Sequence, residues 1–154
     1  TVESLKKYLH ERIPISRAMG VEVVEATFDR VTLAAPLAPN INHRDTVFGG
    51  SASAVAMLAA WSLLHIRLRG EKIDGRIVIH KSAMRFERPI LGNFTATTAD
   101  IDPSAWRRFL SVLEQKGRAR IKMASALRCN DENVAELEGD FVASGAQATP
   151  GGAR

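Results

Sequence analysis

The residues best suited to chemistry lie together in a polar loop, residues 40–48, which leads directly into two glycines. Asp45 is the single carboxylate of the loop, and a carboxylate can activate water or attack an acyl carbonyl directly. His43 can serve as a base near neutral pH. Asn40 and Asn42 cannot transfer protons, but their side-chain amides can position a water or donate to an oxyanion. This loop is therefore the first candidate for a catalytic site.

The same side chains also have structural explanations. Asp45 could cap a turn or pair with Arg44 in solvent, and a loop histidine such as His43 is more often exposed or hydrogen-bonded to its surroundings. Turn chemistry explains Asn40 and Asn42 equally well. The sequence leaves both interpretations open.

Three residues after the loop, Gly49, Gly50 and Ser51, make the strongest site prediction. Glycines let the backbone turn sharply and approach a ligand closely, and Ser51 is suited to cap the helix that follows. The first N–H groups of a helix are free, so we predict an oxyanion hole here; the alternative is a tight turn into a packed helix. A serine nucleophile at Ser51 is disfavoured, because the motif Gly-x-Ser-x-Gly would end in Ser53 and its strand–turn–helix context is absent.

The apolar stretch after the glycines predicts a buried helix. Between residues 52 and 66 only Ser53, Ser62 and His65 are polar, and the frequent Ala, Leu and Met are strong helix formers. An amphipathic surface helix would show a polar stripe, which is nearly missing here. A membrane span needs about 20 apolar residues, and the polar residues and flanking amphipathic strands argue against one.

Composition narrows the class of protein. The chain of 154 residues, with 45% hydrophobic and 25% charged residues, fits one soluble globular domain. The net charge of +4 is mild, and the basic residues lack the aromatic interleaving of nucleic-acid binders. The single cysteine, Cys129, and the absence of a visible signal peptide predict a cytoplasmic location. No spacing of metal ligands and no phosphate-binding or dinucleotide motif is present.

Hydrophobic periodicity predicts the elements that position the loop. We expect one domain over residues 1–144 and a disordered tail over residues 145–154, which are rich in Gly, Ala and Pro. The expected elements are an N-terminal helical segment over residues 1–20, strands over 21–26, 30–36, 76–88, 93–101, 118–129 and 134–144, and a helix starting at Asp102-Pro103. Two strands, one buried helix and four strands make an α+β fold, in which an antiparallel sheet curves around a central helix.

The strand predicted over residues 76–88 is long enough to place polar residues near the helix. Its alternation puts five residues on the face that should cover the helix: Val78, His80, Ser82, Met84 and Phe86. Two of them, His80 and Ser82, either reach a substrate channel or are satisfied within the core.

Two stretches resemble the hotdog thioesterases. The first is the polar loop with the double glycine and the central helix, and the second is Phe86-Glu87-Arg88-Pro89-Ile90-Leu91-Gly92, similar to the Phe-x-x-Pro-x-x-Gly end of the long strand in that superfamily. Residues 35–42 and 46–51 are similar to the YiiD C-terminal-type putative thioesterase family. The resemblance implies a hotdog fold, hydrolysis of acyl thioesters of coenzyme A or acyl carrier protein, and dimers with the site at the subunit interface.

The resemblance also suggests substrate contacts and exposes two departures. Arg85 and Arg88 could bind the phosphates of coenzyme A, with a solvated strand face as the ordinary alternative. Many relatives carry His where this chain has Phe48, and many carry an acid where it has Met57. A catalytic acid must therefore come from elsewhere.

The sequence thus favours an acyl-CoA or acyl-carrier-protein thioesterase that uses no cofactor beyond the coenzyme A or phosphopantetheine of its substrate. The alternatives are a non-catalytic acyl-CoA-binding hotdog module and a hotdog dehydratase or hydratase, for which His43 or His80 would have to serve. We expect a homodimer, or a dimer of dimers, with no nucleic-acid or membrane partner. Self-pairing of the long strand would let His80 or Arg85 face the partner's Asp45.

Overall fold

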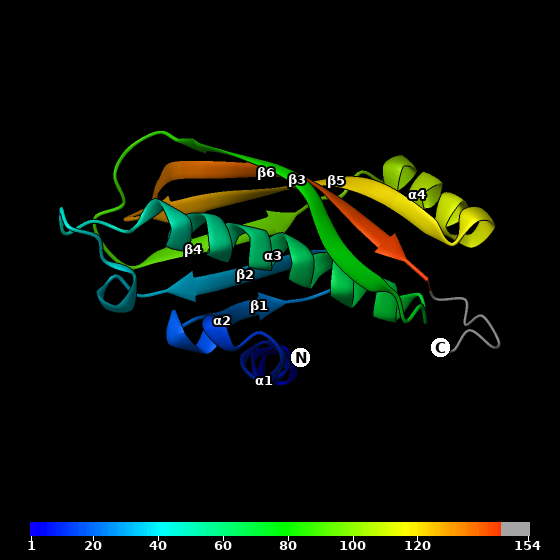
Figure 1. The fold of residues 1–154 in the computed structure, drawn as a ribbon, viewed down its shortest axis with the longest axis horizontal. Helices are drawn as coiled ribbons and strands as arrows, with labels where there is room; N and C mark the ends of the chain where they lie inside the picture. The colour runs from blue at the N-terminus through cyan, green and yellow to red at the C-terminus, as the bar shows by residue number, and fades with distance from the viewer. Residues whose placement is uncertain (146–154) are drawn as a thin grey trace.

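One curved sheet and one long helix organise the computed structural model, which describes residues 1–145. The six strands of the described chain are all antiparallel and follow the order β1-β2-β4-β5-β6-β3. The strands are β1 Glu22–Ala26, β2 Arg30–Ala35, β3 Arg76–Phe86, β4 Phe94–Ala99, β5 Arg118–Cys129 and β6 Glu132–Ser144; the helices are α1 Val2–Arg12, α2 Pro14–Ala18, α3 Gly49–Gly70 and α4 Pro103–Lys116, with a short 3-10 turn η1 at Ala38–Asn40. The sheet curves around α3, which confirms the predicted hotdog fold (Figure 1).

The central helix α3 is buried, as predicted. Eleven of its residues, among them Ala59, Leu63 and Leu64, are enclosed by the sheet and the N-terminal helices. By length and composition α3 could cross a membrane, but 61% of its most apolar window is buried inside the domain, as in the core helix of a soluble domain. Small and straight-chain apolar residues form the helix, and burial on several sides removes the need for a polar stripe.

A buried polar chain ties the middle of α3 to the sheet. The Ser125 hydroxyl on β5 donates to the backbone carbonyl of Ala56 at 2.7 Å, and it lies 2.6 Å from the Thr98 hydroxyl on β4. All three groups are withdrawn from water, so each depends on the others for hydrogen bonding. The chain fixes the helix relative to two adjacent strands.

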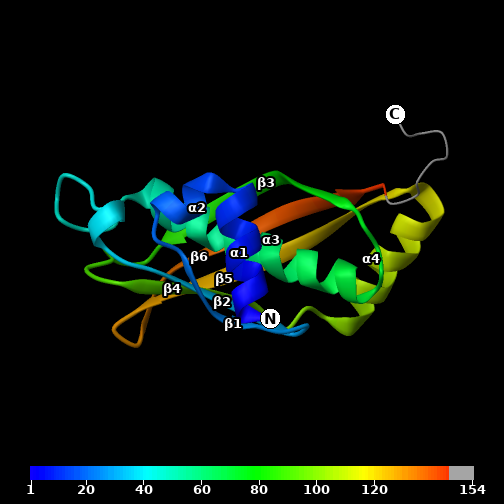
Figure 2. The same ribbon diagram turned by 90° about the horizontal axis from the view of Figure 1, so that it is seen from below.

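The remaining helices cover one edge and one end of the sheet. The helices α1 and α2 lie beside β1, while α4 lies at the end of the molecule opposite the polar loop (Figures 1 and 2). The predicted start of α4 is confirmed, because the Asp102 carboxylate accepts a hydrogen bond from the Ala105 N–H at 2.9 Å. Gly117 ends α4 with a φ of 74°, a conformation that favours glycine.

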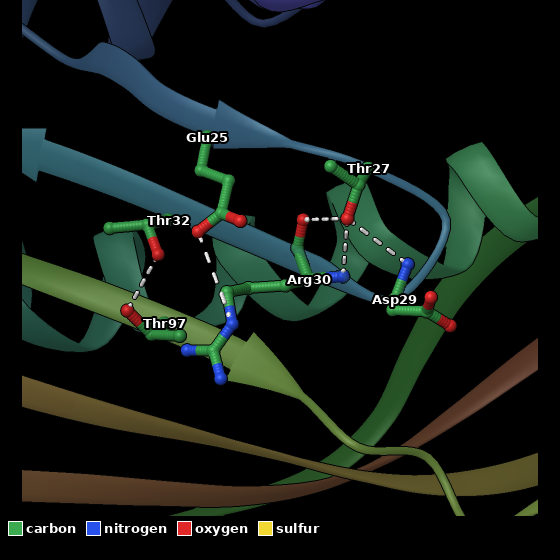
Figure 3. A network of polar contacts seen from close by, with 6 residues as sticks. All are labelled: Glu25, Thr27, Asp29, Arg30, Thr32 and Thr97. Carbon is green, nitrogen blue, oxygen red and sulfur yellow. Dashed lines mark hydrogen bonds and ion pairs between the residues drawn. The ribbon is translucent and has the colours of Figure 1, made fainter.

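The strands β1 and β2, both predicted, form an antiparallel hairpin with a turn organised by Thr27. The Thr27 hydroxyl accepts hydrogen bonds from the backbone N–H groups of Asp29 and Arg30 (Figure 3). On the neighbouring pair of strands, the hydroxyls of Thr32 and Thr97 lie 2.8 Å apart. These contacts join three strands on the outer face of the sheet.

The edge strand β3 departs from the predicted alternation. Its register with β6 shifts between Ile79 and Lys81, so His80 is an extra residue in a β-bulge. Ile77 and Ile79 therefore pack against the core, while Val78 is 50% exposed and His80 is exposed. The prediction that Val78 and His80 cover the helix is wrong, because one extra residue exchanges the faces of a strand.

The predicted tail over residues 145–154 lies outside the described residues except for Gly145. The Gly145 N–H donates to the carbonyl of Gly117 at 2.8 Å, so that residue is anchored at the end of α4.

Candidate active site

A cavity of about 460 Å³ opens where the polar loop meets the end of β3. Thr46, Val47 and Gly49 line one side, and residues 86–90 line the other. The loop and the β3–β4 connection lie at the same end of the molecule in both views (Figures 1 and 2). The structure thus brings together the two stretches that carried the family resemblance.

Backbone hydrogen bonds hold the two walls of this cavity together. The Val47 N–H donates to the Ile90 carbonyl at 2.9 Å, and the Phe48 N–H donates to the Asn40 carbonyl at 2.7 Å. The side chains of Val47 and Ile90 are 6% and 2% exposed, so apolar packing supports the same junction. The cavity is therefore built on an anchored frame.

The N-terminus of α3 presents free donors at this place. Phe48 is the N-cap and, within the described chain, no side chain caps the helix. The first helical hydrogen bond runs from the Ala52 N–H to the Phe48 carbonyl at 3.1 Å, and the N–H groups of Gly49, Gly50 and Ser51 find no acceptor among residues 1–145. The prediction that Ser51 caps the helix is wrong, since Ser51 is the third helical residue. Three oriented N–H groups and the helix dipole favour an anion here.

The double glycine serves close packing of aromatic rings. Neither glycine has a positive φ, so the backbone conformation does not explain why glycine occupies these two positions. A Cβ on Gly50 would lie 2.4 Å from Cε2 of Phe48, and one on Gly49 would lie 3.5 Å from Cζ of Phe86. The Phe48 ring therefore lies against the bare backbone of Gly50, and the Phe86 ring lies beside Gly49.

The two asparagines of the loop hold its shape. Asn40 is 2% exposed, and its amide nitrogen donates to the carbonyls of Met19 at 2.9 Å and Pro36 at 2.7 Å. The Asn42 carbonyl oxygen accepts from the N–H groups of Arg44 and Thr46, and its amide nitrogen donates to the Thr46 hydroxyl at 2.9 Å. Both side chains do the turn chemistry that the sequence left open beside a functional role.

Asp45 and His43 lie on the solvent side of the loop. Both are exposed, and neither lines the cavity at Gly49. Asp45 has a φ of 63°, a left-handed conformation that aspartate tolerates, and it makes no ion pair within residues 1–145. The structural alternative of a pair with Arg44 is therefore absent from the described chain, and a catalytic role for Asp45 or His43 stays a prediction.

The predicted phosphate-binding arginines differ in position. Arg88 lines the cavity and pairs with Glu132 at 2.9 Å, whereas Arg85 is engaged by Glu136 and, at 2.9 Å, by Glu87. All of these groups are half exposed, so the pairs contribute little to stability and can exchange partners. Arg88 is thus the arginine that the structure places beside Gly49, and the exposed His80 lies outside this cavity.

Sequence reasoning missed Glu87 and the ring of Phe86 as cavity residues. The Phe-x-x-Pro stretch contained the signal, but the strand was predicted to continue to residue 88. In the structure β3 ends at Phe86, and the Glu87 N–H donates to the carbonyl of Val134 at 2.8 Å. Glu87 is the carboxylate that lines the cavity. Among residues 1–145, no group of three His, Cys, Asp or Glu is arranged to hold a metal ion.

Comparison with known proteins shows the family and the fold of the chain. A family model described as "Putative thioesterase (yiiD_Cterm)" matches residues 2–145. A protein of unknown function from Chlorobaculum tepidum is 28% identical, with 93% of each chain covered and a TM-score of 0.87. A "putative thioesterase" from Shewanella oneidensis is 26% identical, with 94% of this chain and 97% of that chain covered and a TM-score of 0.83. A thioesterase from Haemophilus influenzae shares the fold at 13% identity, with 97% and 94% covered and a TM-score of 0.76.

Proposed function

We propose, from the premise that the chain belongs to the putative thioesterase (yiiD_Cterm) family, that it hydrolyses an acyl thioester in the cavity at Gly49. The observation that carries this proposal is the set of free N–H groups at the start of α3, of which Gly49 lines the cavity wall. Turnover of a panel of acyl-CoAs, followed by release of free thiol, tests it. A folded protein without thiol release on any acyl chain would contradict it.

The geometry suits attack of water on a thioester carbonyl. The carbonyl oxygen becomes an oxyanion as the water oxygen bonds to carbon, and the N–H groups of Gly49, Gly50 and Ser51 are the donors available to it. The C–S bond then breaks, giving a carboxylic acid and a thiol that takes up the proton of the water. One such donor is typically worth about 10²–10³ in kcat.

The water needs a base, and two carboxylates are candidates. Asp45 is the carboxylate of the loop, and Glu87 is the one that lines the cavity. We expect the variant of the true base, Asp45→Asn or Glu87→Gln, to lose at least about 10²-fold in kcat, the scale of general acid–base catalysis. Unchanged turnover of a folded variant removes that residue from the mechanism. Because Asp45 faces solvent in the protomer, its role depends on a partner subunit.

Self-association through β3 completes the proposal. In the described chain β3 is an edge strand that pairs only with β6, and Val78 and Phe86 on it are 50% and 49% exposed. An exposed edge of eleven residues needs a cover, and a two-fold copy of the same strand can supply it, since two-fold dimers are the commonest oligomers. Such a dimer, alone or paired into a tetramer, would bring the loop that carries Asp45 towards β3 of the partner. Sedimentation equilibrium at micromolar concentration would refute it by showing a folded monomer.

A non-catalytic acyl-CoA-binding module is the second candidate, because Met57 occupies the position at which many relatives carry an acid. Calorimetric binding of an acyl-CoA without thiol release would establish it. The dehydratase alternative needs a histidine with an acid, and neither His43 nor His80 lines the cavity. Enoyl-CoA and 3-hydroxyacyl-CoA in the same assay test that third possibility. The carrier in each case is coenzyme A or phosphopantetheine as part of the substrate.

A further inference from the structure

Three aromatic rings stack on the flank of α3, far along the helix from Gly49. His65 lies 4.7 Å from Tyr8 of α1 and 4.8 Å from Trp61, measured between ring centroids. The interplanar angles are 29° and 12°, so the rings are nearly parallel. The His65 ring is half-buried, and it makes no hydrogen bond within residues 1–145. The three rings therefore form one aromatic cluster that joins α1 to α3.

This aromatic cluster forms one wall of a second cavity, of about 230 Å³. The opposite wall includes Arg69, Asp74 and Arg76, from the end of α3 to the start of β3. Both arginines are exposed, and neither forms an ion pair within residues 1–145. Asp74 is one negative charge against two positive ones, so the cavity attracts anions.

The state of His65 suits a neutral stacking surface. Burial is the main cause that lowers the pKa of His65, and the charge of Arg69 lowers it further, against the opposing effect of Asp74. The ring is therefore uncharged at neutral pH, and the positive charge of the cavity resides on Arg69 and Arg76. Aromatic faces bind planar bases by stacking, and guanidinium groups bind phosphates in a bidentate way.

We propose that this cavity holds the adenine nucleotide end of an acyl-CoA whose thioester lies in the Gly49 cavity of the partner subunit. This assignment rests on the proposed hydrolysis and on the self-pairing of β3, and it names coenzyme A as the carrier. A planar base with phosphates matches the stacked rings and the two unpaired arginines. An acyl carrier protein would present no adenine to this cavity.

The distance between the two cavities decides whether one acyl-CoA can reach both within a single subunit. The aromatic cavity is lined by residues 73–77 at the start of β3, and the Gly49 cavity by residues 86–90 at its end. Within one chain, ten residues of extended strand separate Arg76 from Phe86 by ~33 Å. A two-fold pairing about the middle of β3 exchanges the strand ends, so Arg76 comes opposite the partner's Phe86, about 4.8 Å away between strand axes. The two cavities then adjoin across the interface.

The decisive experiment compares two thioesters that carry the same acyl group, one on coenzyme A and one on N-acetylcysteamine. The double variant Arg69→Gln/Arg76→Gln should raise KM for the acyl-CoA at least about tenfold, and leave KM for the short thioester unchanged. Both residues are exposed, so the fold should persist. Arg107→Gln/Arg108→Gln is the control, because it removes the same charge from the exposed side of α4.

Calorimetry with adenosine 3′,5′-bisphosphate separates this inference from the proposed function. Binding to the parent protein and loss of binding in Arg69→Gln/Arg76→Gln support the nucleotide site, even if neither thioester is turned over and the proposed hydrolysis fails. Turnover of both thioesters with an unchanged ratio of KM values overturns the assignment and leaves the hydrolase intact. If the nucleotide binds but the double variant leaves the ratio of the two KM values unchanged, the cavity binds a free nucleotide. This outcome also overturns the assignment to coenzyme A.

Discussion

Replacing Gly49 by alanine should move stability and activity in opposite directions. The new Cβ would lie 3.5 Å from Cζ of Phe86, an ordinary van der Waals distance, so the helix start accepts it without rearrangement. Gly49 has no positive φ, and alanine in a helix is more stable than glycine by about 0.5–1 kcal/mol. Urea denaturation should therefore show a midpoint equal to or above that of the parent.

Activity should fall because the methyl group occupies the cavity wall that we assign to the thioester. A displacement of about 1 Å at a reacting centre can cost about 10²-fold, and we expect a loss of this size in kcat/KM for thiol release from an acyl-CoA. The same exchange at Gly92 is the matched control, since its Cβ would meet only Cys129 Sγ, at 3.9 Å, and Gly92 does not line the cavity. Gly92→Ala should keep the parent's activity.

The outcome that refutes this reasoning is a stable Gly49→Ala protein with the parent's kcat/KM. The N–H groups at the start of α3 would then not be the oxyanion donors. Gly50→Ala is a less clean test, because its Cβ would lie 2.4 Å from Cε2 of Phe48 and the exposed ring would have to move. A loss of activity there could follow from the ring alone.

Two further predictions concern stability. Ser125→Ala should lower the free energy of unfolding by about 1–3 kcal/mol, because it leaves the buried Thr98 hydroxyl without its partner. Adding Thr98→Val should restore part of the loss. Urea unfolding of both variants measures this, and a double variant whose loss equals the sum of the single losses would contradict it. The lowered pKa of His65 means that the unfolded chain takes up a proton first as pH falls below about 6.5, so stability is full above that pH and declines as pH falls towards the folded-state pKa. His65→Phe, which keeps an aromatic ring in the stack, should flatten this decline, and identical pH profiles of the two proteins would exclude His65 as its source.

Most of the fold follows from local patterns. On β5, predicted over residues 118–129, buried and exposed residues alternate without exception, from Ala119 to Cys129, because one face of that strand meets the core and the other meets solvent. The start of α4 at Asp102 was equally readable, since an N-cap is decided by residues within one helical turn.

The errors in strand faces arise at β-bulges, where one extra residue in a strand changes which side chains point inward. The bulge at His80 adds one residue to β3 without any composition signal. A second shift between Leu127 and Arg128 places Arg128 against Asn133, whereas simple alternation with matched inward faces would set Arg128 against Glu136. Glu136 instead pairs with Arg85 of β3.

The candidate site divides in the same way. The helix start at Gly49 is a local feature, and the sequence located it to within three residues, with Ser51 predicted as the cap in place of Phe48. The cavity also needs residues 86–90, which reach Gly49 only through the tertiary bond between Val47 and Ile90. The stack of Tyr8 on His65 likewise joins two helices that are distant in the sequence, so spacing alone could not predict it.

The position of β3 in the sheet has a consequence for synthesis. β3 is the third strand made, but within the described chain its only neighbour is β6, the last one. A nascent chain that has reached β5 therefore carries an eleven-residue strand with both edges open, next to an apolar helix that lacks part of its cover. Since the pairing of β3 joins residues far apart in the sequence, its formation should come late and limit the folding rate. The strand that we assign to dimer formation is thus also the one that most needs protection from aggregation during translation.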